Sequence, residues 1–157
     1  PCFLCARLRR TTLFKAAQAL GCRKIAFGHN KDDFIETFLI NICYAGQVAG
    51  MLPRQDFFGG EMTIIRPLAL VSSESVERLG RRLNIPVFPN CCPSARTSSR
   101  QEIRSLLEVL YRKNSKVRGN GFHAMSHVKL DYLPPPLDQP RDASNLLQFF
   151  NAERDGS

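Results

Sequence analysis

Two groups of cysteines stand far apart in the sequence, and their spacing suits metal ligation. Cys2 and Cys5 form a Cys-x-x-Cys pair, and Cys91 and Cys92 are adjacent much later in the chain. Four cysteines could make a zinc site, although adjacent ligands in one tetrahedral site need an awkward backbone. The pair with one later cysteine would instead supply three thiolates, which leave one corner of a [4Fe–4S] cluster open. A redox dithiol is a third interpretation of the same spacing.

Arginines follow both cysteine groups directly, and arginine suits bidentate contact with phosphate. If the cysteines meet in space, both arginine groups surround the same site. The formal net charge is +8, and residues 1–31 carry seven basic side chains and no acidic one. These features predict a polyanionic partner, most simply nucleic acid, with an ordinary solvated surface as the alternative. The candidate RNA-binding residues are Arg7, Arg9, Arg10, Arg96, Arg100 and Arg104.

The stretch "FGHNKDDFIET" is the third candidate for chemistry. It predicts a strand that ends at Gly28, a turn, and a helix that begins among polar side chains. Gly28 allows a ligand to approach the backbone closely, and His29 can bind a phosphate or polarise a substrate. Asp32 and Asp33 can hold Mg²⁺ directly or through water. An acidic first turn that only complements the helix dipole is the alternative interpretation.

The elements that must position these residues alternate between helix and strand. Hydrophobic periodicity predicts helices over residues 3–20, 30–44, 72–84, 98–113 and about 120–130, and strands over 23–28 and 62–68. Residues 45–61 are rich in turn formers and predict a loop with a short helical piece. The pattern predicts an α/β fold with a mainly parallel sheet and flanking helices, in which ligands bind at the carboxyl ends of the strands.

Composition indicates a soluble, cytoplasmic protein. Hydrophobic residues make up 43% and charged residues 23% of the 157 positions, and neither a signal peptide nor a membrane-spanning run is visible. We therefore expect reduced thiols, with Cys22 and Cys43 buried in apolar segments. The predicted domain covers residues 1–130, and residues 131–157 predict an extended, proline-rich tail.

Four segments together resemble a known enzyme family. They are "PCFLCARLRR", "KIAFGHNKDDFIET", "IIRPLA" and "NCCPSARTSSRQEI". In this order and at these separations they resemble the PP-loop ATPases that thiolate tRNA, and most closely the TtcA family, which makes 2-thiocytidine. The resemblance covers most of residues 2–115, with a weaker likeness to about residue 130. The second and third segments would equally fit the lysidine synthetases of the same superfamily, and the cysteines favour TtcA.

The resemblance implies an incomplete Rossmann-like domain and a chemistry for each group. ATP, with Mg²⁺, adenylates the C2 oxygen of a tRNA cytidine, and sulfur then reaches C2 from the open iron of a [4Fe–4S] cluster. The implied partners are tRNA and a sulfur donor such as a cysteine desulfurase, and a homodimer is one implied assembly. Gly28, His29 and Asp32 would bind the nucleotide, and His29, Asp32 and Asp33 would serve catalysis. The implied cluster ligands are Cys2, Cys5 and Cys92, with Cys91 as an extra thiol.

One family motif is absent from this sequence. An SGGxDS-type PP-loop, which cradles the pyrophosphate of ATP in the family, has no counterpart here, and the glycines of Phe58–Gly60 stand in another context. We therefore expect the chain to be the C-terminal part of a longer protein, inactive alone. The alternatives are a lysidine-synthetase-like enzyme and a zinc-stapled, basic RNA-binding module. Aerobic purification could also place zinc in a cluster site.

Overall fold

The computed structural model describes residues 2–88 and 98–133, with side chains from Leu4 onward. Cys91, Cys92 and Arg96 lie outside the described residues, as does the side chain of Cys2. The predicted tail also lies outside them from residue 134 onward. The chain divides into one unit over residues 1–126 and a second from residue 127 onward. In the second unit a short 3-10 turn, η3 (Leu130–Tyr132), is described.

The described strands form one small sheet in the order β1-β3-β2. β1 (Lys24–Ala26) runs parallel to β3 (Met62–Ile65), and β2 (Arg54–Phe57) runs antiparallel to β3. β3 lies in the middle, and its side chains from Met62 to Ile64 are buried. The two predicted strands are confirmed with shorter bounds.

The prediction of a loop over residues 45–61 was wrong where β2 forms. The sequence "RQDF" lacks the β-branched residues that mark a strand, and only pairing with β3 makes it one. A tight turn, η1 (Phe58–Gly60), joins the two strands. Positive φ angles at Phe58, Gly59 and Gly60 produce this turn, which accounts for the paired glycines.

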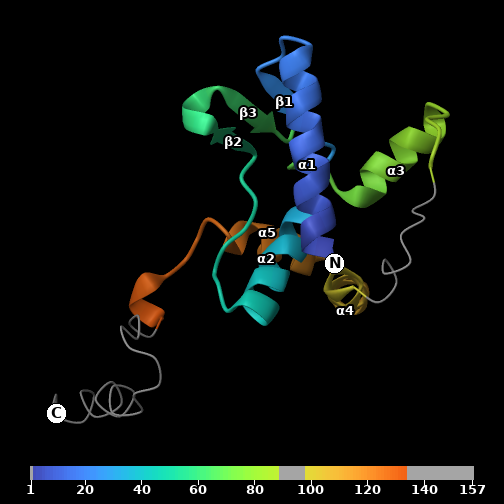
Figure 1. Cartoon of the computed structure of the whole chain (residues 1–157). Coiled ribbons are helices and arrows are strands. Elements are labelled where there is room, and N and C mark those ends of the chain that lie inside the picture. The colour runs from blue at the N-terminus through green and yellow to red at the C-terminus, as the bar shows by residue number, and fades with distance from the viewer. Residues whose placement is uncertain (1, 89–97, 134–157) are drawn as a thin grey trace, which may run out of the picture. The chain divides into compact units, whose positions relative to one another are not determined.

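Five α-helices form in the described residues, as predicted, and Figure 1 shows α1 running beside the sheet. Gly46, in the left-handed conformation, ends the second helix. The last helix begins and ends earlier than the predicted residues 120–130. The bounds are α1 (Cys2–Ala19), α2 (Lys31–Ala45), α3 (Ser73–Arg82), α4 (Ser99–Lys113) and α5 (Lys116–Ala124).

The main apolar cluster lies among α2, α4 and α5. Ile35 of α2 packs with Ile103 and Leu107 of α4, and all three are at most 5% exposed. Phe34 contacts the ring of Phe122 at 5.9 Å between centroids, which joins α5 to α2. This packing fixes the start of α2 relative to α4 and α5, where the candidate site lies. The α/β fold class is confirmed.

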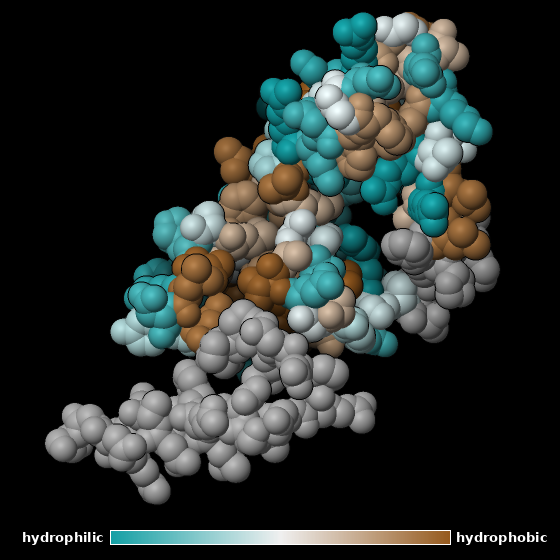
Figure 2. Space-filling model, turned by 60° about the vertical axis from the view of Figure 1, so that its left-hand side comes forward, coloured by the Kyte–Doolittle hydropathy of each residue, from teal (hydrophilic) through white to brown (hydrophobic). Residues whose placement is uncertain are grey.

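Many apolar side chains remain on the surface, where Figure 2 shows brown patches among the hydrophilic groups. Leu4 and Leu8 of α1 are each more than half exposed. Cys22 and Cys43 are exposed too, so the prediction that these thiols are buried was wrong. Cys22 lies in the turn after α1, and Cys43 faces outward near the end of α2. None of the described helices combines the length and apolar character needed to cross a membrane.

Candidate functional site

The start of α2 is organised by a reciprocal cap. Oδ1 of Asn30 accepts hydrogen bonds from the backbone N–H groups of Asp32, at 2.9 Å, and Asp33, at 3.2 Å. Oδ2 of Asp33 in turn accepts from the backbone N–H of Asn30, at 2.8 Å. This is a capping box, which satisfies orphan donors at both positions. Asp33 therefore stabilises the start of α2, which is the alternative role that the sequence offers for its acidic first turn.

Asp32 ties three helices together. Its Oδ2 accepts hydrogen bonds from the backbone N–H and the hydroxyl of Ser73, at 2.7 and 2.9 Å, where α3 begins. Its Oδ1 accepts from Nε of Arg118 on α5, at 2.8 Å. Asp32 is 7% exposed, and each of its oxygens has a partner in the chain. Direct ligation of Mg²⁺ by this carboxylate would have to displace one of these partners.

Glu36, one turn further along α2, is buried between two arginines of α4. Its carboxylate is 3% exposed and accepts hydrogen bonds at 2.8 Å from Nη1 of Arg100 and from Nε of Arg104. The two arginine side chains are 43% and 48% exposed, so each keeps a solvent-facing edge. Hydrogen bonding to Glu36 raises the pKa of Arg104. These two predicted RNA-binding residues thus hold α4 on α2.

Tyr111 lies beside the Asp32–Arg118 pair. The guanidinium carbon of Arg118 sits 4.5 Å from the centre of the Tyr111 ring, a cation–π contact. The hydroxyl is buried and makes no hydrogen bond of good geometry. Burial, and then the charge of Asp32, raise the pKa of Tyr111 to about 12. Tyr111 is therefore neutral at physiological pH.

A cavity of about 420 Å³ opens over these groups, among the starts of α2 and α3 and the faces of α4 and α5. Its charged lining has more carboxylates than guanidinium groups, and the latter come from Arg104 and Arg118. Such a cavity disfavours a bare phosphate and favours a cationic or hydrogen-bonding group. The lining carboxylates are Asp32, Asp33, Glu36, Glu74, Glu77 and Glu108.

His29 lies at the carboxyl end of β1, next to Arg66, which follows β3. Nε of Arg66 donates to Nδ1 of His29 at 3.3 Å. Burial is the main cause that lowers the pKa of His29, with Arg66 and Arg100 acting the same way and Asp33 opposing them. Gly28, just before it, is exposed, and a Cβ there would meet no atom within 4 Å. The space beside Gly28 is therefore open, and the approach of a ligand to its backbone remains a prediction.

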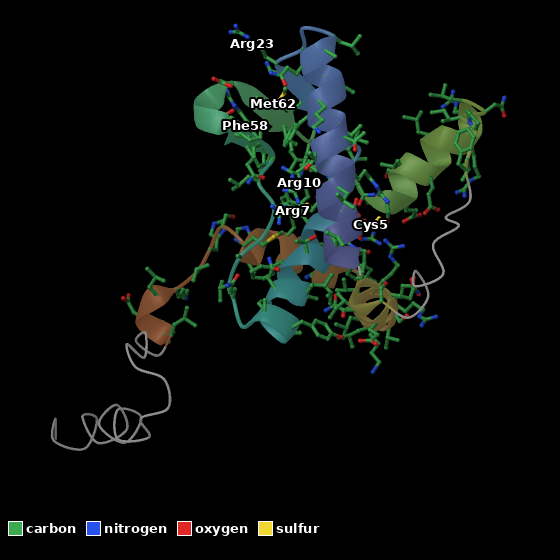
Figure 3. All side chains as sticks on the ribbon, viewed as in Figure 1. Cys5, Arg7, Arg10, Arg23, Phe58 and Met62 are labelled. Atoms are coloured by element: carbon green, nitrogen blue, oxygen red, sulfur yellow. The ribbon has the colours of Figure 1, made fainter. Side chains whose placement is uncertain are left out.

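Cys5 and the candidate RNA-binding residues of α1 lie on the surface. Cys5 is exposed and free, and Figure 3 shows it followed along the helix by Arg7 and Arg10. Arg9 is also exposed, and α1 contains no acidic residue. Among the side chains that the structure describes, residues 4–88 and 98–133, no group of three or more His, Cys, Asp or Glu residues could hold a metal ion. The predicted set of three cysteines includes members outside the described residues, so it remains a prediction.

A second cavity, of about 820 Å³, lies at the opposite ends of the parallel strands. Phe14, Lys15, Arg23, Phe58 and Met62 are among the residues that line it, and three of them are labelled in Figure 3. The rings of Phe14 and Phe58 meet edge to face at 5.5 Å. Because Arg23 precedes β1 and Met62 begins β3, this cavity is separate from the edge that carries His29.

Sequence reasoning placed Glu36 in the polar cluster at the start of the second helix, and it missed three residues of the site: Arg66, Ser73 and Arg118. Arg66 carried a usable signal, since it follows a strand predicted to be parallel to the one before His29. Ser73 stands in a serine cluster typical of a helix start, where a backbone N–H is free to bind a carboxylate. Arg118 gave no signal, and the arginine partners of Glu36 were not predicted, because these partners are remote in sequence.

Comparison with known proteins identifies the family to which this chain is related. No family model matches the chain. The chain is 40% identical over 129 residues to a tRNA-cytidine(32) 2-sulfurtransferase of Citrifermentans bemidjiense, which covers 81% of this chain and 51% of that protein. The sulfurtransferase of the same name from Anaeromyxobacter dehalogenans is 36% identical over 158 residues, covering 97% and 53%. The resemblance to the TtcA family is confirmed. The chain spans about half the length of the TtcA relatives it matches.

A solved structure supports the fold. The U34-tRNA thiolase NcsA from Methanococcus maripaludis, solved with its [4Fe–4S] cluster, superposes with a TM-score of 0.62 at 20% identity. The match covers 82% of this chain and 45% of that one. At this identity the likeness shows a shared fold between this TtcA relative and a tRNA thiolase.

Proposed function

We propose that the chain is a portion of an ATP-dependent tRNA thiolase that forms 2-thiocytidine in the cytoplasm. The observation that carries the proposal is sequence similarity to tRNA-cytidine(32) 2-sulfurtransferases along 81% to 97% of the chain. In this reaction the C2 oxygen of cytidine attacks the α-phosphorus of ATP, and pyrophosphate leaves. Sulfur then bonds to C2, and the C2–O bond breaks with release of AMP.

The cysteines fit a cluster by their chemistry. Three thiolates would come from Cys2, Cys5 and Cys92, and Cys5 is exposed and free, as a ligand to a solvent-accessible cluster must be. Cys2 begins α1 one turn before Cys5, so both backbone positions lie on the same side of the helix. A bound [4Fe–4S] cluster would supply the sulfur for transfer, replenished by a donor such as a cysteine desulfurase.

We assign the tRNA contact first to α1. Arg7, Arg9 and Arg10 are exposed on a helix without acidic residues, immediately after Cys5. Phosphate contacts from such a helix would orient tRNA with its target base near the sulfur site. Arg100 and Arg104 can add contacts through their exposed edges, whereas Arg96 lies outside the described residues. A homodimer would present two such helices.

The nucleotide is assigned to the edge that carries Gly28 and His29. This edge lies at the carboxyl ends of β1 and β3, where ligands bind in open α/β sheets. The acidic cavity beside it would repel triphosphate unless Mg²⁺ intervened, with Asp32 and Asp33 reaching such an ion through water. Because no PP-loop stands in this sequence, we expect the isolated chain not to turn over ATP.

Anaerobic iron–sulfur reconstitution of the 157-residue chain tests the proposal, read by EPR and by bound iron and sulfide. We expect a cluster in the wild-type chain and in Cys91→Ala, and its loss in Cys92→Ala. The opposite pattern in the two variants would reverse the choice of third ligand. Failure to form any cluster, with zinc bound instead, would favour a zinc-stapled RNA-binding module. ATP–pyrophosphate exchange by the chain alone would contradict the expected inactivity.

A further inference from the structure

His29 and Arg66 meet because two neighbouring strands are parallel. Ala26 of β1 pairs with Ile65 of β3, and the backbone N–H of Phe27 extends the ladder to the carbonyl of Ile65 at 2.9 Å. The next residue after β3 is Arg66, and His29 lies three residues beyond β1. Both side chains therefore start from the same edge of the sheet.

Arg66 is anchored on two sides before it reaches His29. Its backbone N–H donates to the carbonyl of Pro53 at 2.8 Å, and its Nη1 donates to the carbonyl of Leu52. The residue is 8% exposed. These contacts hold the guanidinium group inside the fold with its Nε directed at His29.

We propose that Arg66 is a positioning residue that holds His29 as the neutral imidazole with its proton on Nε2. A guanidinium group has only donors and stays protonated, so Nδ1 of His29 must offer its lone pair to Nε of Arg66. A neutral imidazole whose Nδ1 accepts carries its hydrogen on Nε2. His29 then presents an N–H donor and has no free acceptor nitrogen.

Burial of His29 favours the same neutral state, and the charge of Asp33 opposes it. Arg66 and Arg100 face His29 with positive charge, Asp33 faces it with negative charge, and burial acts in the same direction as the arginines. Arg10 of α1 lies near enough to Arg66 to lower the pKa of its guanidinium, after burial. The ring edge of Phe27 covers another side of His29, at 5.5 Å between centroids. The result is an imidazole that resists taking a proton.

This inference deepens the proposed function and rests on it only for the identity of the ligand. In the thiolation reaction, His29 would donate from Nε2 to an oxygen of the substrate and stabilise negative charge there. It would not act as the general base, because its acceptor nitrogen is already occupied by Arg66.

The test is NMR of the imidazole nitrogens in the uniformly ¹⁵N-labelled 157-residue chain, with long-range ¹H–¹⁵N correlations. We expect the pattern of the Nε2–H tautomer for His29, and a titration midpoint below the ordinary value of about 6.5. In Arg66→Met we expect a mixture of tautomers and a higher midpoint. Arg66→Lys keeps a donor and a charge, so we expect it to restore part of the wild-type signal.

Two outcomes would overturn the inference. One is an Nδ1–H or doubly protonated His29 in the wild-type chain at neutral pH, which decides the matter even if Arg66→Met fails to fold. The other is an unchanged His29 signal in a folded Arg66→Met variant. Neither readout depends on cluster formation, so a failed reconstitution would refute the proposed function and leave this inference standing.

Discussion

Nε of Arg118 donates to Oδ1 of Asp32 at 2.8 Å, although the two residues lie 86 positions apart in the sequence. The same carboxylate accepts two hydrogen bonds from Ser73, where α3 begins. Three helices thus converge on one buried anion. Asp32, whose motif predicts a catalytic role, therefore holds α2, α3 and α5 together.

We predict that Asp32→Ala lowers the free energy of unfolding by about 3 kcal/mol, since it leaves a mostly buried guanidinium without its anion. Asp33→Ala should cost about 1 kcal/mol, the usual value for losing a helix cap. Urea denaturation of both variants makes the comparison. Equal, negligible losses would mean that the aspartates contribute nothing to the fold and serve only a bound ion.

The buried ion pairs of Glu36 can be compared with an exposed ion pair in a second test of stability. Glu36→Gln removes the charge between Arg100 and Arg104, and we expect a loss of about 2 kcal/mol, typical of hydrogen bonds to a charged group. The control is Glu77→Gln, because Glu77 pairs with Arg81 at 3.8 Å on the exposed face of α3. That change should stay within about 0.5 kcal/mol. A control as damaging as Glu36→Gln would refute the contrast.

The stability of the chain should fall on acidification, in part through His29. Burial and neighbouring arginines lower the pKa of His29 in the folded chain. The unfolded chain therefore takes up this proton first, and the contribution to stability is complete above about pH 6.5 and lost as pH falls through the folded pKa. In His29→Asn this titrating group is gone, so the variant does not lose the stability that wild-type His29 loses on acidification. We expect a shallower decline in the free energy of unfolding for the variant, measured by urea denaturation from about pH 7.5 to 5.

Three exposed, free cysteines provide a matched test of the cluster. We predict that Cys5→Ser abolishes cluster formation on anaerobic reconstitution, since one of three thiolates is lost. Cys22→Ser and Cys43→Ser are the controls, because these thiols are also exposed and free but lie outside the predicted ligand set. Bound iron and the EPR signal report the outcome. Loss of the cluster in a control, with Cys5→Ser unaffected, would move the site away from the start of α1.

The basic face of α1 should account for part of the salt dependence of tRNA binding. A double variant, Arg7→Gln with Arg10→Gln, removes two phosphate contacts, so the slope of log affinity against log salt should shrink by about 1 to 2. Arg81→Gln with Arg82→Gln removes the same charge from the end of α3 and serves as control. Filter binding of tRNA at several salt concentrations gives both slopes. Equal slopes for the two variants would show that α1 contributes only net charge.

Much of the fold could be predicted because its signals are local. Hydrophobic spacing and cap residues are read within a few positions, so both parallel strands and the first four helices were predicted close to their observed bounds, and α5 was displaced by a few residues. β2 was not predicted, because "RQDF" becomes a strand only through pairing with β3. The exposure of Cys43 was not predicted because the spacing of apolar residues indicates a helical face and does not show what covers it, and Cys22 is exposed because it lies in the turn after α1.

The sequence by itself determined the family resemblance, the α/β class and the positions of the chemistry-bearing residues, since each depends on residue types and their order along the chain. Only the tertiary structure decided which charges meet. Asp32 with Arg118, Glu36 with Arg104, and His29 with Arg66 are pairs separated by 37 to 86 positions. Helix packing and a parallel strand pair bring them within hydrogen-bond distance, where burial strengthens their interactions and lowers the pKa of His29.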